Sequence, residues 1–256
     1  MSILRVENIT KRFAGLMALD KVSFETQNGS IQGIIGPNGA GKTTLFQIIS
    51  GVLKPSNGAI YYNDKSITHQ EPHINCAQGI ARTFQSIRLF SGMTVLENVM
   101  TGMHTHLKSG LFMSGFRLPS VRREEAKTRQ KALDILEFVG IKDNADLEAI
   151  SLPYGQQRLV EISRALASEP KLLILDEPAA GMNHTEGKAL AAKIIQIQKT
   201  GVTILLVEHD MGLVMEICDQ IIVLNYGVVI AQGDPLSIQN NSEVIEAYLG
   251  KKDNDA

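Results

Sequence analysis

A phosphate-binding loop motif is the feature that most restricts the fold of this chain. Residues 36–44 read GPNGAGKTT, which satisfies the pattern G-x-x-x-x-G-K-[ST] between an apolar run at 31–35 and a helical pattern at 45–49. Glycines in this stretch let successive backbone N–H groups approach phosphate oxygens, and the following helix adds its positive N-terminal end. The motif therefore predicts a strand, loop and helix that hold a nucleoside triphosphate. The candidate nucleotide-binding residues are Gly36, Pro37, Asn38, Gly39, Ala40, Gly41, Lys42, Thr43 and Thr44.

The last residues of this motif have different expected roles. Lys42 can reach the β- and γ-phosphates, and the hydroxyl of Thr43 is placed to coordinate the accompanying magnesium ion. The spacing leaves the role of Thr44 open. The alternative is a glycine-rich turn with a surface lysine. The flanking strand and helix patterns weigh against it, because such a turn does not require them.

Three further side chains are expected at the same edge of the sheet. The apolar run 172–175 is followed by Asp176 and Glu177, at the end of a strand where open α/β sheets collect their ligands. Asp176 fits a magnesium ligand, and Glu177 fits the acceptor of a proton from the water that attacks the γ-phosphate. The alternative is an acid that only caps the next turn. His209 follows the run 202–207 and could bring an imidazole there, with a core or capping histidine as the alternative.

Composition narrows the protein class. The chain has 256 residues, 44% of them hydrophobic, and a net charge of -2, which argues against a nucleic-acid binder because such proteins usually carry a basic stripe. There is no apolar run of membrane-spanning length and no signal-peptide pattern at the start, so we expect a cytoplasmic protein. Cys76 and Cys218 lie far apart in the sequence, which favours free thiols over a disulfide.

Apolar periodicity predicts an α/β fold. An alternating, strand-rich N-terminal section gives way to helices between about 95 and 166, in which Leu136 and Val139 share a buried face and Gly140 ends a helix. Short apolar runs then predict buried parallel strands. The expected strands are 3–9, 22–25, 31–35, 59–62, 79–84, 172–175, 202–207 and 221–224, with helices at 156–167, 186–199 and 210–219. Asn28 and Gly29 predict a hairpin turn, and the tail 251–256 is expected to be disordered.

Weaker signals lie outside these elements. Residues 108–119 read KSGLFMSGFRLP, which predicts a long loop, either a partner contact or a plain linker. The charges at 122–129 predict a solvated helix face rather than a membrane surface. His104 and His106 alternate like a metal pair but have no third ligand nearby in the sequence. We expect the remaining histidines on the surface, namely His69, His73 and His184.

Several motifs in the expected order resemble those of ABC transporter ATP-binding subunits. The resemblance runs from Leu4 to Leu249. Gln85 in GIARTFQ matches the Q-loop, residues 152–156 match the signature, LLILDEP matches the Walker B strand, and His209 in LLVEHD matches the switch histidine. The same resemblance makes Phe13 the aromatic side chain that stacks on adenine, whereas its sequence context alone would make it a core residue.

The resemblance implies a fold and a division of the chain. The fold is a P-loop NTPase core with a mixed or parallel sheet, an N-terminal antiparallel β subdomain and an inserted α-helical subdomain. The whole of 1–256 would be one ABC ATPase domain. Residues 1–94 and 167–256 would form the nucleotide-binding core with its β subdomain, and 95–166 the helical signature subdomain.

The resemblance also implies how ATP and Mg²⁺ would be used. Two such subunits would bind head to tail, trap two ATP molecules and hydrolyse them. The catalytic residues would be Glu177, His209 and Gln85, and the magnesium ligands Thr43, Gln85 and Asp176. The signature residues would act on the nucleotide of the partner subunit, and these are Leu152, Pro153, Tyr154, Gly155 and Gln156. Gln85 would couple dimer closure to membrane-spanning permease subunits, which would contact residues around 86–97.

Two departures from the family pattern bear on the ATP sites. The usual signature reads Leu-Ser-Gly-Gly-Gln, so the serine hydroxyl expected at the γ-phosphate is replaced by Pro153. Proline is tolerated at a helix start because the N–H that it lacks would be unbonded there. Asn183 stands where the wider family carries aspartate. Either change could make the two ATP sites unequal.

The stretches LPYGQQ, DEPAAGMN and EHDM are similar to ATPases of branched-chain amino-acid importers. This likeness implies a second ABC ATPase subunit, identical or different, permease subunits, and an external substrate-binding protein reached indirectly. It places the chain at the cytoplasmic face of the inner membrane, peripheral through the permeases and without nucleic acid. Importers of urea or amides, a soluble ABC ATPase acting on nucleic acid or ribosomes, and a nucleotide clamp that scarcely hydrolyses remain alternatives.

Overall fold

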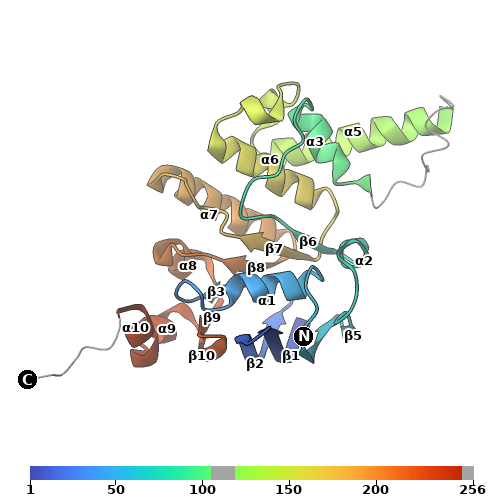
Figure 1. Ribbon diagram of the computed structural model, residues 1–256. Helices are drawn as coiled ribbons and strands as arrows, with labels where there is room; N and C mark the ends of the chain where they lie inside the picture. Colours follow the sequence, from blue (N-terminus) through green and yellow to red (C-terminus); the bar gives the residue numbers. More distant parts are fainter. Residues whose placement is uncertain (105–118, 250–256) are drawn as a thin grey trace, which may run out of the picture. The chain divides into compact units, whose positions relative to one another are not determined.

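The computed structural model describes residues 1–104 and 119–249 of the chain, drawn in colour in Figure 1. By internal packing the chain divides into two compact units. The first comprises Met1–Asn75 with Lys171–Ala256, and the second comprises Cys76–Pro170. In the described residues, no helix combines the length and the hydropathy needed to cross a lipid bilayer.

An antiparallel sheet in the first unit has the strand order β2-β1-β4-β5. Its strands are β1 (Ser2–Phe13), β2 (Leu16–Gln27), β4 (Asn57–Tyr62) and β5 (Lys65–Ser66). Phe13 pairs with Leu16, so β1 and β2 form a tight hairpin in which Ala14 has a φ of 47°. The alternation at 3–9 predicts this arrangement, because one face of such a strand packs on the core while the other faces solvent.

The predicted hairpin at Asn28 and Gly29 is wrong. These residues do form a turn, in which Gly29 has a φ of 73°. The next strand, β3 (Ile31–Ile35), is parallel to β8 (Thr203–Val207) and β9 (Gln220–Asn225) and is not paired with β2. An Asn-Gly pair signals a left-handed backbone, but it does not choose the following partner. All five residues of β3 are buried, so the strand needs cover on both faces and enters the parallel sheet.

This second sheet runs in the order β10-β9-β3-β8-β7 within the first unit. It includes β7 (Leu172–Asp176), and β10 (Val228–Gly233) lies antiparallel to β9. Ile34 pairs with Val207, which in turn pairs with Asp176, so three parallel strands end in one row. The segments that follow these three strands therefore leave the sheet at the same edge.

Two helices of the first unit were expected from the sequence, one after β7 and one after β8. The helices of this unit are α1 (Lys42–Ile49), α2 (Pro72–Ala77, which reaches into the second unit), α7 (His184–Lys199), α8 (Met211–Ile217), α9 (Pro235–Gln239) and α10 (Ser242–Leu249).

Apolar periodicity predicted none of β10, α9 and α10. Both cysteines are free thiols. Burial raises the pKa of Cys218 to about 12.

The second unit is mainly helical. It contains β6 (Ile80–Arg82), α3 (Val95–Thr101), α5 (Pro119–Val139) and α6 (Tyr154–Leu166), with 3₁₀ turns at Lys142–Asn144 and Ala149–Ser151. Leu136, Val139 and Val160 belong to its core, and Gly140 has a φ of 86° just after α5, as the sequence predicts. Most of the predicted loop at 108–119 lies outside the described residues, as do His106 and the tail at 251–256. His69, His73 and His184 are exposed, as expected.

Candidate active site

The phosphate loop leaves β3 and enters α1 with the backbone that its glycines permit. Gly39 and Gly41 have φ values of 81° and 103°, and Gly41 is the N-cap of α1. A Cβ atom on Gly41 would lie 2.7 Å from the carbonyl oxygen of Ala18, and one on Gly36 would lie 2.0 Å from that of Leu224. Only glycine fits these two positions. The loop therefore has the bare backbone and the helix start that a phosphate group requires.

Lys42 is the first residue of α1 and its side chain is turned back over the loop. Its Nζ donates hydrogen bonds to the carbonyl oxygens of Gly36 at 2.6 Å and Pro37 at 3.0 Å. The residue is 6% exposed. Burial lowers its pKa, and the charge of Glu177 partly offsets this shift. A largely desolvated ammonium group next to a carboxylate therefore lies at the centre of the loop.

Glu177 and His209 meet at the carboxyl edge of the parallel sheet. Glu177 Oε1 lies 2.7 Å from His209 Nε2, and the side chains are 13% and 44% exposed. The backbone N–H of Glu177 donates to the carbonyl of Val207 at 2.9 Å, which ties the end of β7 to the end of β8. Glu177 has a φ of 47°, a left-handed conformation that is strained for a residue with a side chain. Asp176, directly before it, is 2% exposed.

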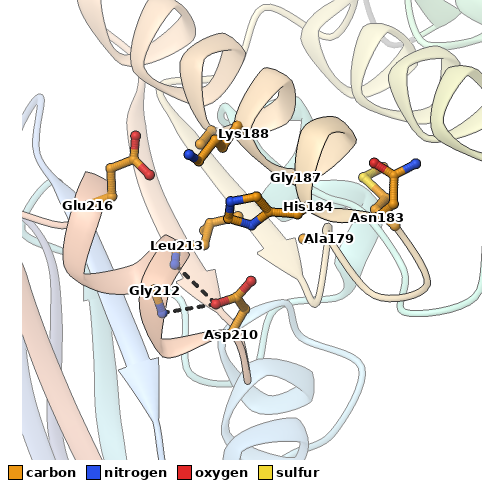
Figure 2. A pocket seen from close by; sticks show the side chains of 11 residues that line it. Ala179, Asn183, His184, Gly187, Lys188, Asp210, Gly212, Leu213 and Glu216 are labelled. Atoms are coloured by element: carbon orange, nitrogen blue, oxygen red, sulfur yellow. Dashed lines mark hydrogen bonds between the residues drawn. The ribbon is translucent and has the colours of Figure 1, made fainter.

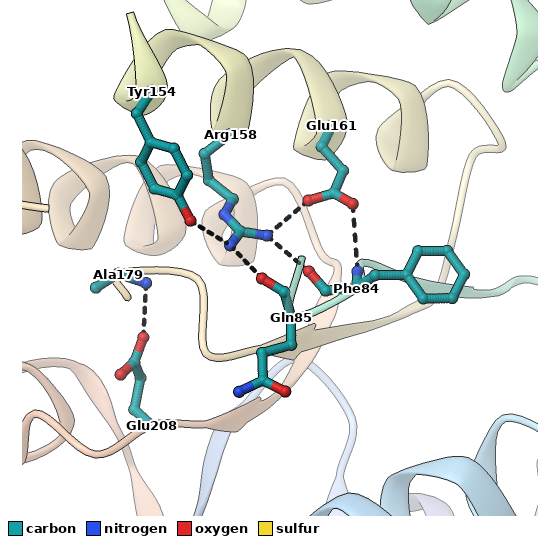
Figure 3. A network of polar contacts seen from close by, with 7 residues as sticks. All are labelled: Phe84, Gln85, Tyr154, Arg158, Glu161, Ala179 and Glu208. Carbon is teal, nitrogen blue, oxygen red and sulfur yellow. Dashed lines mark hydrogen bonds and ion pairs between the residues drawn. The ribbon is translucent and has the colours of Figure 1, made fainter. Parts of the chain in front are cut away.

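A buried acid, Glu208, lies in this region and was not predicted from the sequence. Glu208 is 3% exposed and accepts hydrogen bonds from the N–H groups of Ala179 at 2.7 Å and His209 at 3.1 Å. Figure 3 shows the first of these bonds. Burial raises the pKa of Glu208, while the backbone donors lower it. The sequence signal for its burial was its position directly after the apolar run 203–207, because a residue next to a fully buried strand can itself be buried.

Phe13 is not a core residue. It ends β1 with 43% of its surface exposed, and Lys11 Nζ lies 5.0 Å from the centre of its ring. The alternative to stacking, a core residue, is excluded by this exposure, because the β1–β2 hairpin carries the ring out of the core. Stacking of this ring on adenine stays a prediction.

The residues that match the Q-loop and the signature lie in the second unit. Gln85 is exposed. Leu152 is buried, and Pro153 is the N-cap of α6, so the helix begins at Tyr154, two residues before its expected start. The N–H groups of Gln156 and Gln157 donate to the carbonyl of Pro153 at 2.9 and 3.0 Å. Proline therefore starts the helix without disturbing it, as the sequence predicts.

Asn183 has a local structural role. It is the N-cap of α7, and its side chain accepts a bond from the N–H of Glu186 at 3.0 Å. Glu186 accepts in return from the N–H of Asn183 at 3.0 Å, which completes a capping box. An aspartate would accept the same bond, so the cap does not distinguish the two residues.

A cavity of about 310 Å³ lies beside this cap, between α7 and α8, and Figure 2 shows its side chains. His184 and Lys188 come from α7, and Glu216 comes from α8. Asp210 caps α8 by accepting from the N–H groups of Gly212 and Leu213 at 2.9 and 3.2 Å. None of the phosphate-loop residues lines this cavity, so it is separate from the site around Lys42.

Comparisons with known proteins decide the family. The profile of the ABC transporter family matches residues 19–180, and that of the branched-chain amino acid ATP-binding cassette transporter matches residues 228–254. The chain belongs to the ABC transporter family. It is an ATP-binding cassette of the α/β P-loop NTPase architecture, and cassettes of this family bind and hydrolyse ATP.

Similar proteins include a curated transport protein and two solved cassettes. The high-affinity branched-chain amino acid transport ATP-binding protein LivG of Escherichia coli K12 is 43% identical over 250 residues, covering 97% of this chain and 98% of LivG. The ADP conformation of an ABC transporter cassette has a TM-score of 0.86 and 37% identity, covering 98% of this chain and 100% of that one. A dimeric cassette in a post-hydrolysis state with ADP and phosphate has a TM-score of 0.75 and 25% identity, covering 91% and 98%.

Proposed function

We propose that this chain is the ATPase subunit of an importer for branched-chain amino acids. The observation that carries the hydrolytic part is the 2.7 Å pair of Glu177 Oε1 and His209 Nε2, at the edge where the phosphate loop also leaves the sheet. Branched-chain amino acids are supported as the cargo by the name of LivG, a branched-chain amino acid transport protein, and by the family profile matched at 228–254. The substrate would not touch this chain, which supplies only the energy.

In the proposed mechanism, Lys42 and the loop N–H groups hold the β- and γ-phosphates of ATP. Glu177 accepts a proton from the water whose oxygen attacks the γ-phosphorus, and the bond to the bridging oxygen breaks to give ADP and phosphate. His209 holds the Glu177 carboxylate in position through Nε2. Phe13 would stack on the adenine ring, which its exposure at the end of β1 permits.

The oxygen donors of Thr43, Gln85 and Asp176 fit magnesium. The Thr43 hydroxyl, the Asp176 carboxylate and the Gln85 side-chain oxygen would be its protein ligands, and oxygen ligands are those that Mg²⁺ prefers. When bound, the ion neutralises charge on the phosphate oxygens. Thr43 is exposed on the first turn of α1, and Asp176 is buried at the end of β7. The place of Asp176 at the carboxyl end of a parallel strand supports this assignment, because open α/β sheets collect their ligands at that edge.

We propose further that two cassettes, identical or different, close head to tail over two ATP molecules. Residues 152–156 of each would meet the nucleotide of the other, with residues 95–166 as the helical signature subdomain. The dimeric relative with ADP and phosphate supports this arrangement. The cassettes would bind permease subunits at the cytoplasmic face of the inner membrane, and an external binding protein would deliver the amino acid.

The deciding experiment measures ATP turnover by the purified chain, alone and with candidate permease subunits in lipid, beside the Glu177→Gln variant. Turnover that requires Glu177 and rises with the permeases is expected. Turnover that ignores the permeases would instead indicate a soluble ABC ATPase. Tight ATP binding without turnover in either setting would indicate a clamp, the outcome that Pro153, which has no hydroxyl, would favour. Uptake assays with leucine, urea and short amides separate the cargo classes.

A further inference from the structure

A buried ion pair on the signature helix holds the backbone of the Q-loop. Arg158 and Glu161 lie one turn apart on α6, with side chains 0% and 2% exposed, and Arg158 Nη1 is 2.7 Å from Glu161 Oε2. Burial raises the pKa of Glu161, while Arg158 lowers it. Such a pair is weak evidence for stability, because removing two charges from water costs about as much as their attraction returns. Its geometry therefore calls for a functional explanation.

Both side chains also bond the main chain of residues 84 and 85 (Figure 3). Arg158 Nη1 donates to the carbonyl of Phe84 at 2.7 Å, and Nη2 donates to the carbonyl of Gln85 at 2.9 Å. Glu161 Oε1 accepts from the N–H of Phe84 at 3.3 Å. Three bonds thus fix the main chain of the Q-loop to the signature helix, while the side chain of Gln85 stays exposed. A guanidinium group suits this role because its fork can serve two carbonyls at once.

The same guanidinium group reaches the start of the helix. Arg158 Nη2 also lies 3.4 Å from the hydroxyl of Tyr154, the first residue of α6 and the third residue of the signature. Tyr154 is 44% exposed. One side chain therefore contacts both the signature and the backbone that carries Gln85, all within the second unit.

We propose that Arg158 is a positioning residue that couples the signature start to Gln85. This inference depends on the proposed function, in which the signature meets the partner's ATP and Gln85 responds to the permeases. A shift of Tyr154 on nucleotide contact moves the guanidinium group, and the guanidinium group moves the Gln85 backbone. The Tyr154 hydroxyl gives the signature a polar contact that Pro153 cannot supply. ATP binding within one chain depends on the phosphate loop of the first unit and does not require this link.

The test uses the assembled transporter in lipid and the Arg158→Lys variant. Lysine keeps the charge beside Glu161 but lacks the planar fork of the guanidinium group, whose two terminal nitrogens bond the two carbonyls, Glu161 and Tyr154 at once. We expect permease-stimulated turnover to fall by about tenfold, with the ATP dissociation constant changed by less than about twofold. Tyr154→Phe should give a smaller loss in the same direction. Arg129→Lys, an exposed arginine of α5 paired with Asp146, is the matched control and should behave as wild type.

Two further variants separate coupling from packing. In the Gln85→Ala background, Arg158→Lys should cost less than about twofold, because residues that act through one another are not additive. The Arg158→Met/Glu161→Leu double variant removes the pair without leaving an unpaired charge, so it should fold and bind ATP but lose stimulation. Wild-type stimulation in the double variant would overturn the proposal, as would an equal fold-loss with and without Gln85. Failure of the proposed function would show separately, as wild-type turnover that ignores the permeases.

Discussion

The N–H of Gly227 donates a hydrogen bond to the carbonyl oxygen of Ala40 at 3.0 Å, so the turn between β9 and β10 is bonded to the phosphate loop. The carbonyl of Gly227 accepts a second bond from the N–H of Asp20 on β2 at 2.8 Å. One residue thus joins the loop to the antiparallel sheet. Gly227 has a φ of 80°, and a Cβ atom on it would lie 2.6 Å from the carbonyl oxygen of Ala18.

Gly227→Ala should weaken ATP binding by about tenfold, equivalent to about 1.4 kcal/mol, because the Cβ atom clashes with the backbone of β2 and shifts the turn that bonds Ala40. Isothermal titration with ATP measures the effect. Gly201→Ala is the matched control, since Gly201 has a φ of 96° and a Cβ atom on it would meet nothing within 4 Å. Both variants should lose about 1 kcal/mol of stability through their positive φ. If both also keep the wild-type affinity, the bond to Ala40 has no part in binding.

Glu177→Gln should keep ATP binding and slow hydrolysis by about 10²- to 10⁴-fold, which corresponds to about 3 to 5.5 kcal/mol of barrier. The amide cannot accept the proton of the attacking water, although it can still bond His209. Phosphate release under saturating ATP measures the rate. Glu216→Gln changes an exposed acid of α8 and serves as the control. Unchanged turnover would remove Glu177 from its proposed role.

Lys42→Ala should weaken ATP binding itself by about 10- to 100-fold, since hydrogen bonds to charged groups contribute about 1.5–3 kcal/mol. The dissociation constant is measured directly, with a thermal melt to confirm folding. Lys188→Ala, an exposed lysine of α7, should leave the constant unchanged. An unaltered constant for Lys42→Ala would contradict the assignment of the phosphate loop.

Glu208 should make stability depend on pH in a direction opposite to that of a typical surface acid. Its pKa is raised above the ordinary value of 4.5, so the folded state holds a proton that the unfolded state has already released. As the pH rises from 4.5 through the raised pKa, the free energy of unfolding of the wild type should fall relative to that of Glu208→Gln. Urea titrations at several pH values, from about 4.5 to about 8, test this. A constant difference between the two proteins would show that Glu208 does not titrate in this window.

Sequence predicted the parts of the site that consecutive residues encode. The phosphate loop and the edge acid Glu177 follow apolar runs, and parallel strands must bring their carboxyl ends together. Glu208, Gly227 and Arg158 were missed because their roles arise from contacts between segments far apart in the chain. The path of the chain after Asn28 was predicted wrongly for the same reason. Local patterns fix a strand or a turn, but the choice of neighbour depends on which faces must be covered.

The left-handed backbone of Glu177 implies a trade-off between thermal stability and the rate of ATP hydrolysis. This conformation costs a residue with a side chain about 1–2 kcal/mol, whereas glycine adopts it freely. Selection for heat resistance alone would therefore favour glycine at this position, and the resulting protein would lack the proton acceptor that we propose. A library screened for melting temperature should deplete the acid, while one screened for phosphate release should retain it.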